Sequence, residues 1–202
     1  MLASNRWISV SAGVIVGLLS FGSSSFAADS SPGLGFDRPA ADEMEFYAED
    51  LSSEDFLQSI HIVNLAEIDM GQLSMDKSQD KDIRDYGRII VRDHRLTDEA
   101  LRFIADQKDI SLNNESFTEL TVSLKQNLDQ GMTRLQGASP EDFRAVLSEV
   151  AIAGHQQTLD LIKRAQSEVS DRGVRVFAFL IEPVIQSHLK MAQKLQAEPQ
   201  PQ

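Results

Sequence analysis

Apolar side chains recur at intervals of three and four residues along most of this chain. This spacing places them on one face of an α-helix. It runs through four long stretches, which cover residues 52–76, 81–108, 139–168 and 174–195. The pattern therefore predicts four main helices, each of roughly 24–28 residues.

Helix-terminating signals set some of the boundaries. Ser52 and Asp55 have the spacing of a capping box, so we expect the first helix to begin at Ser52. Ser139 followed by Pro140 predicts an N-cap and a first helical position for the third main helix. Pro183 lies inside the last apolar run, where it is expected to kink or split the helix.

The connections indicate the topology. Consecutive main helices are joined by short polar turns, except for the segment 109–139, which carries a weaker helical pattern interrupted by Gly131. The sequence has no sustained strand alternation and no Asn-Gly or Asp-Gly hairpin turn. Short turns make neighbouring helices antiparallel, and one long crossover is the ferritin-like variant. We therefore predict an all-α, ferritin-like four-helix bundle over residues 52–196, with a long helical crossover between helices 2 and 3.

The N-terminus has the features of a secretory signal over residues 1–28. Arg6 supplies a positive charge, an apolar stretch follows, and Ser25 and Ala27 occupy the −3 and −1 positions of a small-residue cleavage site. The apolar core is shorter than the ~20 residues of a membrane span, although an uncleaved anchor is the alternative. We expect a periplasmic protein with no transmembrane anchor after signal cleavage.

The remaining terminal segments show no hydrophobic period. Residues 29–51 are predicted to form a flexible linker, because they begin with a Gly/Pro/Ser-rich stretch and continue with an acidic one. Residues 197–202 are rich in proline and glutamine and are predicted to be a disordered tail.

Composition narrows the functional classes. The chain has 202 residues, a formal charge of −12 and no cysteine. Such an acidic chain lacks the basic footprint that nucleic acid requires, so nucleic acid is excluded as a partner. Without cysteine there are no disulfides, thiolate metal sites or cysteine nucleophiles. Any metal site must use histidine and carboxylate ligands.

The candidate functional residues are the polar residues that lie on the apolar faces of the predicted helices. Each main helix places one ionisable residue there, near its middle: Glu67, His94, His155 and His188. Mid-helix positions of an antiparallel bundle meet at similar height, and a buried carboxylate needs a partner. Three imidazoles and one carboxylate suit a single iron, zinc, manganese or copper ion. The sequence thus predicts a metal site in the bundle core.

Two alternatives to the metal site remain open at this stage. The four side chains could form a metal-free hydrogen-bonded cluster, in which case the protein is a cell-envelope structural or interaction module. Two of the histidines could instead be the axial ligands of a haem. The sequence contains no phosphate-binding loop, His-Glu-x-x-His motif or nucleophile elbow, so enzymatic activity is undecided.

Five further polar residues are weaker candidates. Asp98 lies one turn after His94 and is expected either to orient the His94 ring or to be solvated. His61 is interpreted as a packing or surface residue. By helical phase, Asp93, Glu149 and Glu182 point away from the stripe and are expected to be solvated.

Four segments resemble the family known as domain of unknown function 4142. The resemblance lies in the runs 56–73, 83–94, 143–155 and 183–195, of which the second ends in the Asp-His pair typical of the family. It covers roughly residues 52–196. It implies a ferritin-like bundle that bacteria export, with no settled activity, and the four core residues named above match the family's polar core positions.

Comparison with the resembled family and with di-iron bundles limits the predicted metal site. The chain departs from the family at Asp98, where asparagine is frequent, and at Leu147, where tyrosine is common. Di-iron bundles use Glu-x-x-His pairs on two helices. The residues three before His94 and His188 are Val91 and Ile185, so the ligands support one metal ion at most.

Overall fold

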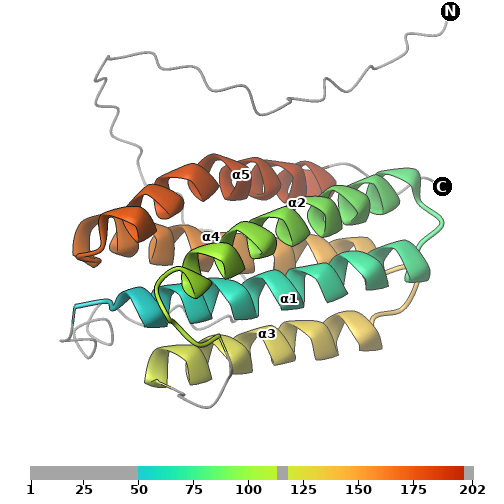
Figure 1. The fold of residues 1–202 in the computed structure, drawn as a ribbon. Helices are drawn as coiled ribbons and strands as arrows, with labels where there is room; N and C mark the ends of the chain where they lie inside the picture. Colours follow the sequence, from blue (N-terminus) through green and yellow to red (C-terminus); the bar gives the residue numbers. More distant parts are fainter. Residues whose placement is uncertain (1–49, 113–117, 198–202) are drawn as a thin grey trace, which may run out of the picture. The chain divides into compact units, whose positions relative to one another are not determined.

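A computed structural model describes residues 50–112 and 118–197 and shows five α-helices within them. The predicted signal, nearly all of the predicted linker and residues 198–202 of the predicted tail lie outside this part of the chain. The helices, shown in Figure 1, are α1 (Ser53–Lys77), α2 (Lys81–Asp106), α3 (Glu119–Gly137), α4 (Phe143–Glu168) and α5 (Arg172–Ala197).

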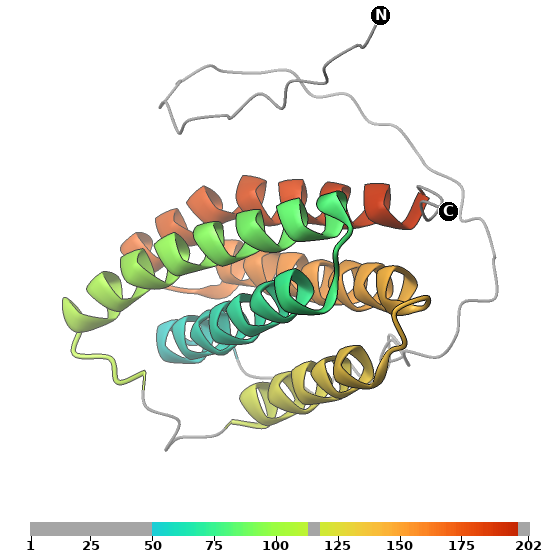
Figure 2. The same cartoon turned by 90° about the vertical axis from the view of Figure 1, so that its right-hand side faces the viewer.

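Helices α1, α2, α4 and α5 form a four-helix bundle, and α3 is the helical crossover. In the bundle, α1 packs against α2, α2 against α5, α5 against α4 and α4 against α1. Helix α3 lies along α1 and α4 (Figure 2). The predicted all-α bundle with a helical crossover is therefore confirmed, and its ferritin-like kinship stays a prediction.

Polar contacts at the helix ends fix the antiparallel order. The backbone N–H of Leu51, just before α1, donates to Glu168 at the end of α4 (3.2 Å). Lys108, just after α2, pairs with Asp171, just before α5 (2.6 Å). Leu51 is buried, so the last residue of the predicted linker belongs to the core.

The apolar core is divided into two clusters by a polar layer. One cluster contains Phe56, Leu101, Ile162 and Phe177, and the other contains Tyr86, Ile90, Leu147 and Leu195. In each bundle helix, the predicted site residue lies along the chain between the residues that it gives to the two clusters. The four residues are thus sandwiched between apolar layers near mid-height of the bundle.

The helix boundaries confirm one predicted cap and correct another. Ser52 caps α1, where its Oγ accepts a hydrogen bond from Asp55 N (2.9 Å). The prediction that α4 begins at Pro140 is wrong: the helix begins at Phe143. Ser139 accepts a hydrogen bond from Asp142 N instead (3.2 Å), so its side chain closes a turn before the helix.

Pro183 does not split α5, which is continuous through it. Proline has no N–H to donate to the carbonyl four residues earlier, which belongs to Phe179. Phe179 is 57% exposed, so water can solvate this carbonyl. Because the Phe179 carbonyl lies on the outer surface of the bundle, α5 tolerates the proline.

Glycines allow close helix contacts at two places. A Cβ on Gly71 of α1 would lie 2.8 Å from the carbonyl oxygen of Gly87 of α2, and a Cβ on Gly87 would lie 2.5 Å from that of Gly71. Gly131, which the sequence suggested as an interruption, lies within α3, and a Cβ there would approach Val150 of α4 to 2.9 Å. These glycines let the helix backbones approach one another.

The start of α2 is held to α4 by an ion pair. Asp80 caps α2 through Oδ1, and its Oδ2 accepts a hydrogen bond from Arg144 of α4 (2.6 Å). Arg144 is buried and also lies 3.4 Å from the carbonyl of Leu195.

None of the described helices carries an apolar stretch long enough to cross a lipid bilayer.

Candidate metal centre

Three histidines from three helices meet in the polar layer. His94 of α2, His155 of α4 and His188 of α5 are each 1% exposed. One ring nitrogen of each lies within 4.8 Å of a ring nitrogen of both others. The ring centroids of His94 and His188 are 5.1 Å apart, and those of His155 and His188 are 5.5 Å apart. With the centroids of His94 and His155 6.1 Å apart, the three rings form one compact cluster in the bundle core.

Each ring is oriented through one nitrogen by a hydrogen-bond acceptor. The three N–H groups donate to an amide oxygen, a backbone carbonyl and a carboxylate. The pairs are His94 Nδ1 with Asn64 Oδ1 (2.9 Å), His155 Nδ1 with the Ala151 carbonyl (2.6 Å), and His188 Nε2 with Asp93 Oδ2 (3.0 Å). Because these partners accept, the proton of each neutral ring lies on the nitrogen that faces them.

The opposite nitrogens have no hydrogen-bond partner. They are His94 Nε2, His155 Nε2 and His188 Nδ1, all buried. In a neutral imidazole this nitrogen carries a lone pair, and an unsatisfied buried acceptor is destabilising. Three such acceptors in one layer indicate that the site is arranged to bind an electrophile.

Glu67 of α1 is the fourth group in this layer. It is 4% exposed, and its Oε2 lies 4.0 Å from His155 Nε2. Oε2 is itself buried without a hydrogen-bond partner. The carboxylate therefore flanks the histidine cluster, beyond hydrogen-bond distance of His155.

Burial keeps two of the imidazoles neutral. Desolvation, followed by the neighbouring His188 and His155, lowers the pKa of His94 well below its ordinary value. Desolvation also lowers the pKa of His188, although the hydrogen bond to Asp93 opposes this. Neutral rings are the form that binds metal ions. At neutral pH, His188 and Asp93 therefore form a hydrogen bond between a neutral ring and a carboxylate.

Around the site, the pKa values of Glu67 and Tyr86 are raised, whereas the pKa of Asp93 is lowered. Desolvation raises the pKa of Glu67, partly offset by His155. Burial, together with the charge of Glu67, raises the pKa of Tyr86 well above its ordinary value. Burial alone would raise the pKa of Asp93 too, but hydrogen bonds from His188 and Arg92 hold it at about 2. Asp93 is thus an anion throughout the physiological range.

Two predictions about neighbouring acids are wrong. Asp98 does not orient His94: its Oδ1 lies 2.6 Å from His61 Nδ1 and its Oδ2 accepts from Arg102 (2.7 Å). Asp93 is not merely solvated, because it accepts the hydrogen bond from His188. His61 is buried, as its packing interpretation predicted, and its ring contacts the Asp98 carboxylate.

Asn64 is a site residue that helical phase did not reveal. It lies on α1, one turn before Glu67, and is 1% exposed. A buried amide on a helix that is apolar nearly all round was the available signal.

The remaining two weak candidates are at the surface: Glu149 pairs with Arg134 (2.8 Å), and Glu182 accepts from Gln166 (2.8 Å).

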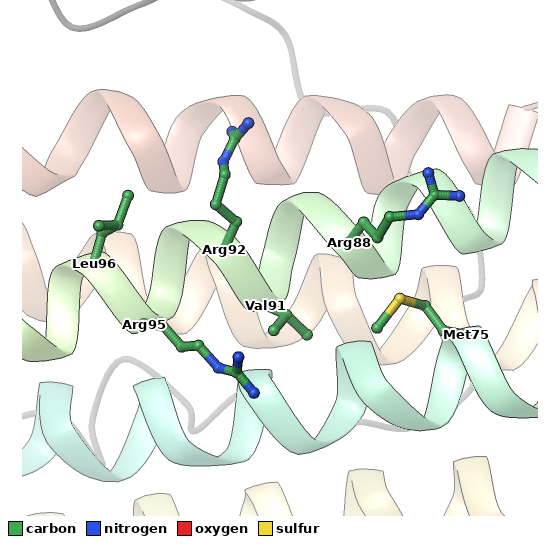
Figure 3. Close-up of a pocket in the computed structure, with 6 residues that line it drawn as sticks. All are labelled: Met75, Arg88, Val91, Arg92, Arg95 and Leu96. Carbon is green, nitrogen blue, oxygen red and sulfur yellow. The ribbon is translucent and has the colours of Figure 1, made fainter.

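A surface pocket of about 350 Å³ on α1 and α2 does not coincide with the centre. It is lined by Met75, Arg88, Val91, Arg92, Arg95 and Leu96. Figure 3 shows the guanidinium groups of Arg92 and Arg95 pointing to opposite sides, Arg92 toward α5 and Arg95 toward α1. Its polar groups diverge, whereas those of the histidine cluster converge, so we locate the chemistry in the core.

The cluster fits a transition-metal ion better than other ligands. Imidazole nitrogens bind zinc, copper, iron and nickel, and metal–nitrogen bonds are about 2.0–2.1 Å long. The three nitrogens lie within 4.8 Å of one another, and tetrahedral coordination would draw them together to about 3.3 Å. Histidine ligands typically donate their other N–H to an acceptor, as all three rings do here.

Comparison with known proteins identifies a family whose function is unknown. The family described as Domain of unknown function (DUF4142) matches residues 39–195. Neither the curated proteins nor the solved structures gave a significant match.

Proposed function

The chain belongs to the DUF4142 family, and from the geometry of its core we propose that it binds a single transition-metal ion. The ligands are His94, His155 and His188, with Glu67 as the fourth. The observation that carries this proposal is the convergence of three buried imidazole rings, each fixed through one nitrogen while its other nitrogen is buried without a hydrogen-bond partner.

A metal ion would satisfy every open acceptor in the layer at once. The three ring nitrogens and Glu67 Oε2 are buried and have no hydrogen-bond partner. Leaving such groups unsatisfied costs about 1–3 kcal/mol each. A divalent cation replaces these penalties with coordination bonds, and the carboxylate balances part of its charge. Zinc, iron, manganese and copper are the candidates.

The proposed role is metal binding or redox chemistry linked to stress. One ion is proposed because Val91 and Ile185 occupy the positions where di-iron bundles carry a second carboxylate. The metal lies between two apolar clusters, and the three imidazoles are almost completely buried. A buried centre of this kind favours holding an ion, or exchanging its electrons, over the turnover of a large substrate.

We also propose that the protein acts in the periplasm. The support is the signal-like pattern of residues 1–28, with Ser25 and Ala27 before the expected cleavage point. Expression of the full chain in a Gram-negative bacterium, followed by fractionation and N-terminal sequencing, tests this. A periplasmic product that begins near Ala28 supports export, and a cytoplasmic product with an intact N-terminus contradicts it.

Metal titration of the purified, metal-free protein tests the central proposal. We expect one Co²⁺ or Zn²⁺ ion per chain in the wild type. His155→Ala and His188→Ala should each weaken binding by about 10–100-fold or more. His61→Gln is the matched control, because His61 is also buried but lies against Asp98, outside the cluster.

Two results would overturn the proposal. One is the absence of stoichiometric binding by the folded wild type, which would favour the metal-free envelope module instead. The other is an equal loss of affinity in His61→Gln and in the cluster variants, because the ion would then not be held by the three converging rings.

A further inference from the structure

We propose that the acidic, aromatic segment just before α1, residues 42–50 of this chain, docks on an exposed apolar face formed by α2 and α5. This face, which we call the α2–α5 face, consists of exposed side chains from the second half of α2 and the first half of α5: Leu96, Phe103, Val176, Phe179 and Leu180. It lies on the outside of the bundle, so this proposal is independent of the metal centre.

The large apolar side chains exposed on the described part of the chain are concentrated on this face. Five of the seven belong to it, and Phe103 and Leu180 are each 67% exposed. Single apolar residues are normal on a protein surface, whereas a contiguous group of them marks an interaction site. The α2–α5 face is therefore a candidate docking surface.

The packing of α2 against α5 makes the exposed side chains contiguous. Lys108, just after α2, pairs with Asp171, just before α5, and the two helices lie side by side (Figure 1). Because the helices are antiparallel, counting away from this ion pair along each one sets Phe103 at the height of Val176. Leu180 follows one turn later on α5. The apolar groups of the two helices thus form one continuous face.

The chain leaves the described bundle at this same end. The backbone N–H of Leu51 donates to Glu168, at the end of α4, and the ring of Phe56 packs against that of Phe177, with centroids 6.4 Å apart. Phe177 is the neighbour of Val176 on α5. The residues that precede α1 are therefore tethered beside the start of the α2–α5 face.

The segment is long enough to reach the face. An extended chain advances about 3.3–3.6 Å per residue, so Tyr47 and Met44 can lie about 10 and 20 Å from Asp50. A helix is about 10–12 Å wide, so this reach is enough to place both side chains on the outer side of α5. The covalent connection also gives the segment a high effective concentration at the face.

The chemistry of the segment complements the face and its rim. Met44, Phe46 and Tyr47 are interspersed with five acidic residues, which are Asp42, Glu43, Glu45, Glu49 and Asp50. Arg172 and Arg175 lie at the positive N-terminal end of α5, within about one turn of the apolar groups. A second copy of the bundle would bring further arginines to this rim, so the acidic segment is the better occupant.

Cysteine pairs in the full chain test the docking, because the sequence has no other cysteine. Tyr47→Cys is combined with Leu180→Cys on the face, or with Val122→Cys as the control, since Val122 is also exposed but lies on α3. A disulfide forms only when the two Cα atoms come close together. We expect the pair with Leu180→Cys to form an intramolecular disulfide about tenfold faster than the control pair or more, as mass spectrometry of unreduced peptides would show.

Met44→Cys with Phe103→Cys provides a second pair, in case residue 47 docks facing away from Leu180. Oxidation rates like that of the control in both pairs would overturn the proposal. Disulfides formed mainly between chains would also overturn it, because the occupant would then be a second copy.

Removal of the aromatic side chains gives an independent readout. Phe46→Ser combined with Tyr47→Ser should increase the binding of an apolar fluorescent dye to the full chain by about twofold or more, because the α2–α5 face is uncovered. These substitutions also remove two apolar side chains from the segment itself. An undocked segment would therefore give equal or weaker dye binding than the wild type, and that result would contradict the docking.

Discussion

At the scale of single residues, the centre depends on the groups that hold the imidazoles as much as on the imidazoles themselves. Asn64, the Ala151 carbonyl and Asp93 each fix one ring and leave its other nitrogen free to coordinate. Asp93 is the only charged acceptor of the three. An ionised acceptor makes the ring a more basic ligand, so Asp93 should influence metal affinity most.

Asp93→Ala is therefore predicted to weaken metal binding by about 10–100-fold, because His188 loses its orienting acceptor. Competition with a chelator of known affinity measures the change. Asp85→Ala is the control on the same helix, since Asp85 pairs with Arg88 at the surface. Equal affinities of Asp93→Ala and the wild type would show that Asp93 does not support the site.

Helical phase was enough to find the histidines but not their partners. His94, His155 and His188 interrupt apolar stripes, and a period of 3.6 residues makes such positions visible in one helix at a time. Asp93 is about 100° around α2 from His94, so its phase pointed elsewhere. It reaches His188 only because α5 packs beside α2. Contacts between helices of this kind are not encoded in the periodicity of either one.

At the scale of helices, the packing of α1 against α2 sets the position of two site groups. Gly71 and Gly87 bring the two backbones together one turn beyond Glu67 and two turns before His94. A wider spacing there would move α1, which carries Glu67 and Asn64, away from the His94 ring. The glycine contact therefore serves both stability and site geometry.

Gly71→Ala should destabilise the protein by about 1–3 kcal/mol, because the added methyl group meets the Gly87 carbonyl and Val91 at 2.8 Å. Urea unfolding of the metal-free protein measures this loss. Gly137→Ala is the control, since nothing lies within 4 Å of a Cβ at that position. If Gly71→Ala were as stable as Gly137→Ala, the Gly71–Gly87 contact would not limit how closely α1 and α2 approach.

The Asp80–Arg144 pair makes the link between α2 and α4 dependent on pH. Burial raises the pKa of Asp80, but the hydrogen bond from Arg144 and those from the α2 backbone outweigh it and lower the pKa overall. A lowered carboxyl pKa stabilises the fold above the unfolded-state pKa of about 3.9, and this stabilisation is lost as the pH falls through the folded-state value.

Asp80→Asn should accordingly reduce the free energy of unfolding by about 1.5–3 kcal/mol at neutral pH, because asparagine still caps the helix but carries no charge. The difference from the wild type should shrink as the pH falls below about 4. Urea unfolding at several pH values measures both. A difference that is independent of pH would contradict the role of the ion pair.

Sequence signals predicted the helices better than their ends. Ser52 is a true cap, because its hydroxyl and Asp55 complete the local hydrogen bonds. Ser139 has the same kind of local bond to Asp142, yet a turn follows it, and the helix starts only at Phe143. Capping side chains and turn-closing side chains make similar local contacts. Phe56 and Phe143 follow the two serines at the same spacing and are both buried, so neither the local bonds nor this pattern distinguishes the two.

At the scale of the whole molecule, the polar layer joins four helices that otherwise meet through two separate apolar clusters. One ligand comes from each bundle helix, so a bound ion would connect all four. In the unfolded chain these ligands are far apart in sequence and do not form a site. Metal binding should therefore stabilise the native bundle as a unit.

Saturating metal is predicted to raise the free energy of unfolding by about 2.7 kcal/mol at a free concentration 100 times the dissociation constant. Thermal unfolding with Zn²⁺ or with a chelator measures the effect. His188→Ala should show a much smaller increase, and His61→Gln should respond like the wild type. If the metal stabilised His188→Ala as much as the wild type, the stabilising ion would have to bind elsewhere on this acidic chain.

The central claim is that one metal ion lies between His94, His155, His188 and Glu67. Anomalous diffraction at the metal absorption edge, from crystals of the full chain grown with Zn²⁺ or Co²⁺, tests it most directly. We predict one strong anomalous peak in the core, at about 2.0–2.2 Å from His94 Nε2, His155 Nε2, His188 Nδ1 and a Glu67 oxygen. A well-ordered core without a peak, or peaks at surface carboxylates alone, would contradict the account.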